Sequence, residues 1–123
     1  MATLTVAIMD PPYESATSTT ALRIVDAAVR KGHHVNVFAY EGAVNLTMKD
    51  QAAHPNPVKG TSLEEEDHPT TSKFISGLLN TGSVDWIACG LCVDERGSGN
   101  WIDGVRRGTP ADLLKWFEQS TNT

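Results

Sequence analysis

Apolar residues in the first half of the chain follow two spacings in turn. Residues 4–9 (LTVAIM) form a short β-branched apolar run, which is typical of a buried strand. Apolar residues then recur at helical spacing over 22–29, and Gly32 is expected to end that helix. A second strand is predicted at residues 35–40. A strand, a helix and a strand in this order indicate a parallel pair of strands and an α/β fold.

The second half continues the same alternation. Helical spacing returns over residues 74–79 and is expected to end at Gly82, and residues 84–89 (VDWIAC) are predicted to form a third strand. Thr109 and Pro110 are predicted to be the cap and first residue of a last helix. The apolar face of that helix consists of Leu113, Leu114, Trp116 and Phe117.

Residues 48–69 differ from the rest because they follow neither spacing. They contain two prolines near residue 56 and an acidic run at 64–67, so we predict one long acidic loop. The acidic run is expected to be an ordinary solvated loop. Alternatively, it is a docking surface for a basic partner protein. With no internal repeat and no linker, the chain is predicted to be a single domain over residues 1–123.

Composition and charge narrow the classes of function. Hydrophobic residues make up 40% of the 123 positions and charged residues 20%, as in a globular domain. The net charge of −5 argues against nucleic acid as a partner, which would need a basic face. No apolar run approaches the roughly 20 residues of a membrane span, and the N-terminus lacks the pattern of a signal peptide. A cytoplasmic protein without membrane contact is therefore expected.

The two cysteines, Cys89 and Cys92, form a C-x-x-C pair. In the cytoplasm thiols stay reduced, so such a pair is expected to be reactive or metal-binding. Cys89 falls at the carboxyl end of the third predicted strand, where parallel sheets collect reactive groups. Gly90 is expected to permit a sharp turn, and the free N–H groups of that turn, with the charge of Arg96, would favour a thiolate. This pattern is typical of a sulfur nucleophile.

Other interpretations of the pair remain open. Both cysteines would also suit a core as small hydrophobes. A structural zinc site needs four ligands, and the four histidines lack the required spacing, so no metal and no cofactor are expected. A thioredoxin-like redox pair usually follows an early strand rather than the third. Tyr13, Glu14 and Ser15 follow the first strand, where they form either an ordinary turn or one wall of a pocket over Cys89.

The motif around the cysteines resembles the YchN-like branch of the DsrE/DsrF-like family of small sulfur-relay proteins. That branch has a C-x-x-C-x-x-x-R-G run, an apolar I-D-G-V segment, and Gly-Thr or Gly-Ser before a last helix, as in "CGLCVDERG" and "WIDGVRRGTPADLLKW" here. Segments 11–15, 21–23 and 35–44 match more loosely. The positions that match the motif are Cys89, Cys92, Arg96, Gly97, Ile102, Asp103, Gly104, Val105, Gly108 and Thr109.

The resemblance implies a three-layer α/β domain, with a mostly parallel sheet flanked by helices, that assembles into trimers or hexamers. It also implies that Cys89 carries sulfur as a persulfide and that Cys92 is the extra thiol of the two-cysteine variety. Family members commonly end with a strand of the type D-x-V-L-x-F, whereas this sequence ends in "EQSTNT". That final strand is therefore expected to be missing.

We accordingly predict a cytoplasmic sulfur carrier, similar to a sulfurtransferase, in which Cys89 holds sulfane sulfur as a persulfide. Cys92 would resolve the persulfide or hold an alternate one, and sulfur donor and acceptor proteins are the expected partners. Two alternatives use the same residues differently. One is a thiol–disulfide redox or sensor protein, and the other is a non-catalytic oligomeric binding module whose cysteines are packing residues.

Overall fold

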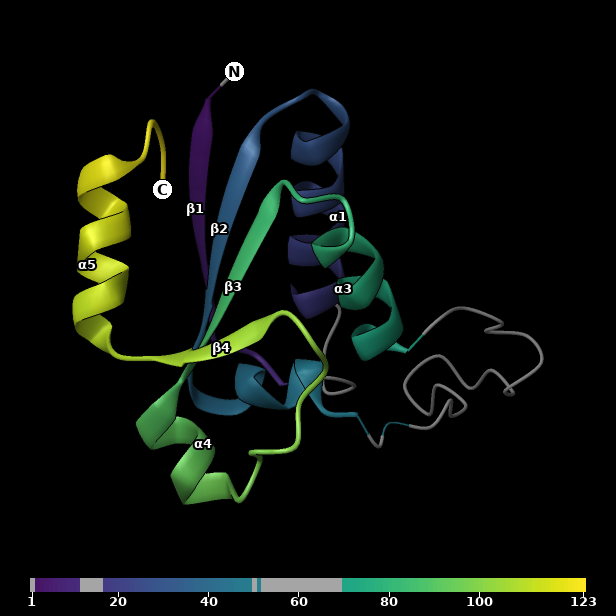
Figure 1. Ribbon diagram of the computed structural model, residues 1–123, viewed down its shortest axis with the longest axis vertical. Coiled ribbons are helices and arrows are strands. Elements are labelled where there is room, and N and C mark those ends of the chain that lie inside the picture. The colour runs from purple at the N-terminus through teal and green to yellow at the C-terminus, as the bar shows by residue number, and fades with distance from the viewer. Residues whose placement is uncertain (1, 12–16, 50, 52–69) are drawn as a thin grey trace.

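A computed structural model describes residues 2–11, 17–49, 51 and 70–123. The sheet has four strands, all parallel, in the order β1-β2-β3-β4 (Figure 1). The three predicted strands lie within one residue of their expected limits. The fourth was not predicted from the hydrophobic pattern. The strands are β1 (Thr3–Ile8), β2 (His34–Ala39), β3 (Val84–Cys89) and β4 (Val105–Gly108).

Helices cover both faces of this sheet. The helices α1 (Thr17–Arg30) and α3 (Thr71–Leu79) lie together on one face, and α5 (Pro110–Gln119) lies on the other (Figure 1). The predicted three-layer α/β fold is thus confirmed. Two short helices, the 3-10 helix η1 (Glu41–Thr47) and α4 (Gly90–Arg96), lie at the carboxyl ends of the strands. None of the helices in the described ranges is long and apolar enough to cross a membrane.

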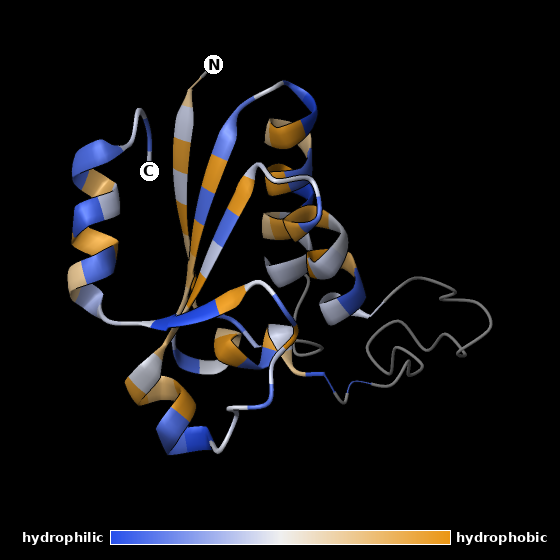
Figure 2. Cartoon of the chain, in the orientation of Figure 1, coloured by the Kyte–Doolittle hydropathy of each residue, from blue (hydrophilic) through white to orange (hydrophobic). Residues whose placement is uncertain are grey.

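The sequence accounts for these elements through burial and capping. All residues of β2 after His34 are buried, as expected for a strand covered on both faces. Figure 2 shows apolar residues on the strands and on the helices beside them. The helix α1 ends before Gly32, whose φ of +87° suits glycine. The helix α5 begins with Pro110, and Thr109 and Asp112 form a capping box, so the predicted start is correct.

The segment after α5 lies beside β1 instead of forming a full strand. The N–H of Thr121 donates to the carbonyl of Thr3 at 2.8 Å, and the N–H of Thr5 donates to the carbonyl of Asn122 at 2.9 Å. These bonds make one parallel bridge, between Leu4 and Asn122, and no fifth strand forms in the described part of the chain. This short pairing protects part of the β1 edge.

The strands β3 and β4 approach closely where both of them end. Cys89 pairs with Gly108 in the sheet register. A Cβ atom on Gly108 would overlap Cγ2 of Ile87 and would lie 2.9 Å from the Asp112 carboxylate. The backbone of Gly108 does not have a positive φ, so its conformation does not require glycine. Glycine is required here because any side chain would collide with these neighbours.

We expect Gly108→Ala to lower the free energy of unfolding by about 1 to 3 kcal/mol, the usual effect of overpacking. Gly77→Ala is the matched control, since nothing lies within 4 Å of a Cβ there. As Gly77 lies inside α3, that change should stabilise the protein by about 0.5 to 1 kcal/mol. Urea denaturation measures both effects, and equal midpoints for the two variants would contradict this account of the sheet edge.

Candidate functional site

The cysteine pair lies where β3 passes into α4. Cys89 is the last residue of β3, and Cys92 lies in the first turn of α4. Their Sγ atoms are 3.1 Å apart, and both cysteines are free thiols. Cys89 is 6% exposed and Cys92 is 7% exposed. Two thiols are therefore held in contact at the carboxyl edge of the sheet and largely shielded from solvent.

The surroundings of the two sulfurs differ. The Cys92 thiol donates a hydrogen bond to Cys89 Sγ. Burial raises the pKa of Cys92, and the hydrogen bond to Cys89 raises it further, while a hydrogen bond from the backbone N–H of Glu41 opposes this shift. Cys92 is thus held as the protonated donor. Cys89 Sγ is the acceptor of this hydrogen bond.

Cys89 opens onto a surface depression with a volume of about 380 Å³. The depression lies between the start of α4, the end of β4 and the start of α5. Its wall includes both polar and apolar side chains, among them Leu91, which is 69% exposed. Beside Cys89 and Leu91, the wall contains Gly90, Arg107, Thr109 and Asp112.

Arg107 is the cation of this depression, and it was not predicted from the sequence. Its guanidinium donates two hydrogen bonds to Asp94, at 2.9 and 2.6 Å. The pKa of Arg107 is raised, mainly by the hydrogen bond and charge of Asp94 and to a smaller degree by the charge of Cys89. Predicting this position would have required β4, whose parallel register brings Arg107 beside the end of β3.

Gly90 matters for a reason that was not predicted. The predicted part of Gly90 in a sharp turn stays a prediction, and its φ is not positive where α4 begins directly after β3. A Cβ atom on Gly90 would lie 2.7 Å from Nε of Arg107 and 2.8 Å from its Cζ. The absence of a side chain allows the guanidinium to lie against the backbone next to Cys89.

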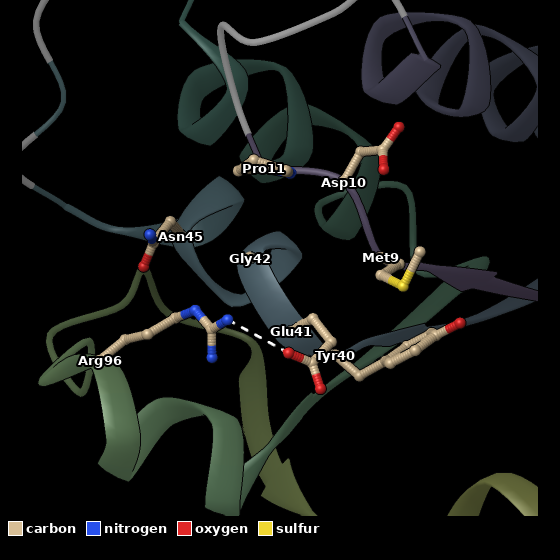
Figure 3. Close-up of a pocket in the computed structure, with 8 residues that line it drawn as sticks. All are labelled: Met9, Asp10, Pro11, Tyr40, Glu41, Gly42, Asn45 and Arg96. Atoms are coloured by element: carbon tan, nitrogen blue, oxygen red, sulfur yellow. Dashed lines mark hydrogen bonds and ion pairs between the residues drawn. The ribbon is translucent and has the colours of Figure 1, made fainter.

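Arg96 faces a second cavity, of about 590 Å³ (Figure 3). Its guanidinium pairs with Glu41 at 3.2 Å and approaches Glu95 at 4.0 Å. The predicted role of Arg96 beside a thiolate stays a prediction, because the contacts of Arg96 are these carboxylates. The lining residues labelled in Figure 3 are Met9, Asp10, Pro11, Tyr40, Glu41, Gly42, Asn45 and Arg96.

Glu41 connects this second cavity with the cysteine pair, and no pattern in the sequence indicates it. Within the described ranges it is the one residue other than glycine with a positive φ, at +51°. Its backbone N–H opposes the rise in the pKa of Cys92, and its carboxylate pairs with Arg96 at 3.2 Å. A strained backbone of this kind persists only where neighbouring contacts hold it.

The remaining predicted site residues are Tyr13, Glu14 and Ser15, which lie outside the described residues, as does most of the predicted loop at 48–69. Their contribution to a pocket stays a prediction. Among the described side chains, no three of the His, Cys, Asp and Glu groups come together as metal ligands would.

These observations define a class, a small α/β protein with a thiol pair at the carboxyl edge of a parallel sheet. The chain belongs to the DsrE/DsrF-like family, whose pattern it matches over residues 2–123. The crystal structure of the YchN protein from E. coli has the same fold, with a TM-score of 0.80 and 20% sequence identity. The match covers 99% of this chain and 97% of that one. The predicted resemblance to YchN-like members is thus confirmed.

Two curated relatives come from archaea. An uncharacterised protein of Methanopyrus kandleri is 31% identical over 121 residues, covering 97% of this chain and 89% of the relative. An uncharacterised protein of Methanocaldococcus jannaschii is 28% identical over 120 residues, covering 96% and 94%. Family membership indicates a role in sulfur relay, whereas the relatives assign no reaction.

We expect Gly90→Ala to displace the Arg107 guanidinium and slow the alkylation of Cys89 by iodoacetamide at neutral pH by a factor of about two to five. The reason is the loss of a positive charge beside the attacking sulfur. A Cys92→Ser background confines the reaction to Cys89. Gly99→Ala is the matched control, because the nearest atom to a Cβ there is 4.0 Å away. Equal rates in both variants would show that Arg107 does not activate Cys89.

Proposed function

We propose that this protein is a cytoplasmic sulfur carrier that holds sulfane sulfur as a persulfide on Cys89. The observation that carries the proposal is the asymmetry of the pair: Cys92 donates its hydrogen bond to Cys89 Sγ, and Cys89 opens onto the depression beside Arg107. The carrier sulfur must be nucleophilic and reachable. The place of Cys89 in the lining of the depression, beside Arg107, supports its assignment as that sulfur. Membership of the DsrE/DsrF-like family supports the same role.

The loading step is a displacement at sulfur. The Cys89 thiolate attacks the outer sulfur of a donor persulfide, the donor leaves as its own thiolate, and Cys89 becomes the persulfide. Arg107 provides positive charge where the attacking sulfur and the product persulfide are negative. The depression is open enough to admit the tip of a donor cysteine side chain, so donor and acceptor proteins are the proposed partners.

A second candidate function rests on the same contact. Two thiols 3.1 Å apart need only approach by about one ångström to form a disulfide, whose S–S bond is about 2.05 Å long. A thiol–disulfide redox or sensor protein would use that step alone. The charge of Arg107 beside Cys89 favours either chemistry, because both begin with a Cys89 thiolate.

Sulfur loading of single-cysteine variants tests the carrier proposal. After incubation with a polysulfide donor, we expect the wild type and Cys92→Ser to gain one sulfur atom by mass spectrometry, and Cys89→Ser to gain none. The physical reason is that Cys89 lines the depression beside Arg107, whereas the pKa of Cys92 is raised and Cys92 is not among the residues that line that depression. Loading of Cys89→Ser to the same extent as Cys92→Ser would contradict the assignment, and a wild type that takes up no sulfur would favour packing cysteines.

We further propose that the protein works as a trimer or hexamer. Apolar side chains are exposed on α5 near the Cys89 depression, with Leu114 61% exposed and Phe117 38% exposed. They lie three residues apart on one side of the helix. Contacts between subunits along this face would shield a persulfide from stray thiols.

Light scattering at micromolar concentration should give three or six times the chain mass of 13.3 kDa. We expect Leu114→Asp to lower that mass to the monomer, because it places a charge in the proposed contact. Ile24→Asp is the control, since Ile24 is 55% exposed on α1, which lies on the other face of the sheet. A monomeric wild type would contradict the proposed assembly.

A further inference from the structure

Cys92 occupies a position that simple carriage of sulfur on Cys89 does not require. Its sulfur lies 3.1 Å from Cys89 Sγ, and both residues are free thiols. It is buried and has no place in the described lining of either cavity. Cys92 Sγ can therefore react with Cys89 far more readily than with a partner protein.

From this geometry we propose that the protein has a sulfide-releasing activity, in which Cys92 displaces the sulfur carried on Cys89 and leaves a Cys89–Cys92 disulfide. The inference rests on the proposed carrier function, because it begins from the Cys89 persulfide. It assigns to Cys92 a step that comes after loading. The leaving group is small and inorganic, so the depression beside Cys89 provides a sufficient exit.

The reaction balances without an external oxidant. Cys92 Sγ attacks Cys89 Sγ, the bond between Cys89 Sγ and the outer sulfur breaks, and the bond between the two Sγ atoms forms. The outer sulfur takes up two electrons and leaves as sulfide, while the two cysteine sulfurs are oxidised to a disulfide. The proton lost by Cys92 ends on the departing sulfide or in solvent. A dithiol reductant then restores the two thiols for another cycle.

The contacts of Cys92 explain why loading and release would be separate events. Burial keeps the pKa of Cys92 above its ordinary value, so little of it is ionised at neutral pH. A protonated thiol is a poor nucleophile, and the persulfide would survive long enough to be passed on. Sulfide release would then be slower than transfer to an acceptor, and it would occur when no acceptor protein has taken the sulfur.

Glu41 is the positioning residue for this step. Its carboxylate holds Arg96 of α4 at 3.2 Å (Figure 3), and the helix that Glu41 begins, η1, packs against α4, which carries Cys92. The backbone of Glu41, with φ at +51°, is strained for glutamate. The ion pair with Arg96 therefore holds the backbone of Glu41 in this conformation. It also holds α4 in place, and so keeps Cys92 next to Cys89.

A single-turnover experiment tests the release step. Wild type and Cys92→Ser are loaded with polysulfide, freed of donor under anaerobic conditions, and followed for dissolved sulfide and for protein mass. We expect the wild type to release one sulfide per loaded chain and to end two hydrogens lighter than the dithiol. Cys92→Ser should keep its sulfur. Unloaded wild type is the control for disulfide formation by stray oxidant.

The outcomes separate this inference from the carrier proposal. A loaded wild type that keeps its persulfide as long as Cys92→Ser does, or that moves the sulfur onto Cys92, would overturn release and leave the carrier intact. Sulfide release without a disulfide would also overturn it. If neither protein takes up sulfur, the carrier proposal fails and the release step fails with it.

Variants of Glu41 test its positioning role through the release rate. Glu41→Ala and Glu41→Gly both lose the ion pair with Arg96, but only glycine adopts a positive φ without strain. We expect release to slow by about tenfold in Glu41→Ala and to stay near the wild-type rate in Glu41→Gly. Glu95→Gln removes the other carboxylate near Arg96 and should have no effect. Equal release rates in Glu41→Ala and Glu41→Gly would exclude a positioning role for the backbone of Glu41. The extent of sulfur loading, measured separately, reports on Cys89.

Discussion

The parallel register at the carboxyl ends of β2, β3 and β4 is the constraint on which the whole site depends. It pairs Ala39 with Ala88 and Cys89 with Gly108, so the three strands end together. The segments that leave these strands have to share a small volume, and that brings Glu41, the cysteines and the start of α5 to one edge. The close approach at Gly108 is part of the same constraint, since a side chain there would push β4 away from Ile87.

Two ion pairs made by residues of α4 give the sulfurs of Cys89 and Cys92 different surroundings. Asp94 holds Arg107 over Gly90, on the side where Cys89 opens to the surface. Arg96 holds Glu41, on the side where Cys92 is enclosed. As a result, a positive charge lies near the sulfur that would attack a donor. The sulfur that would act later, on Cys92, has its pKa raised by burial and by the hydrogen bond to Cys89.

How far the sequence predicts this site depends on how locally each feature is encoded. The strand ending at Cys89 and the capped start of α5 result from short-range patterns, and both are confirmed. The strand β4 has no apolar run, because two of its four residues are exposed arginines, so only pairing with β3 defines it. The importance of Arg107 and Glu41 depends on such pairings between distant segments. The close contact at Gly90 could not be predicted for the same reason, since the group it accommodates comes from β4.

We propose that the two thiols are unequal and that Cys89 is the one that receives sulfur. Peptide mapping by tandem mass spectrometry of the wild-type protein, treated briefly with less than one equivalent of a persulfide donor and then capped, tests it most directly. We expect the added sulfur to lie on Cys89, with Cys92 recovered as the plain capped thiol. Sulfur found first on Cys92, or shared evenly between the two residues, would contradict this claim.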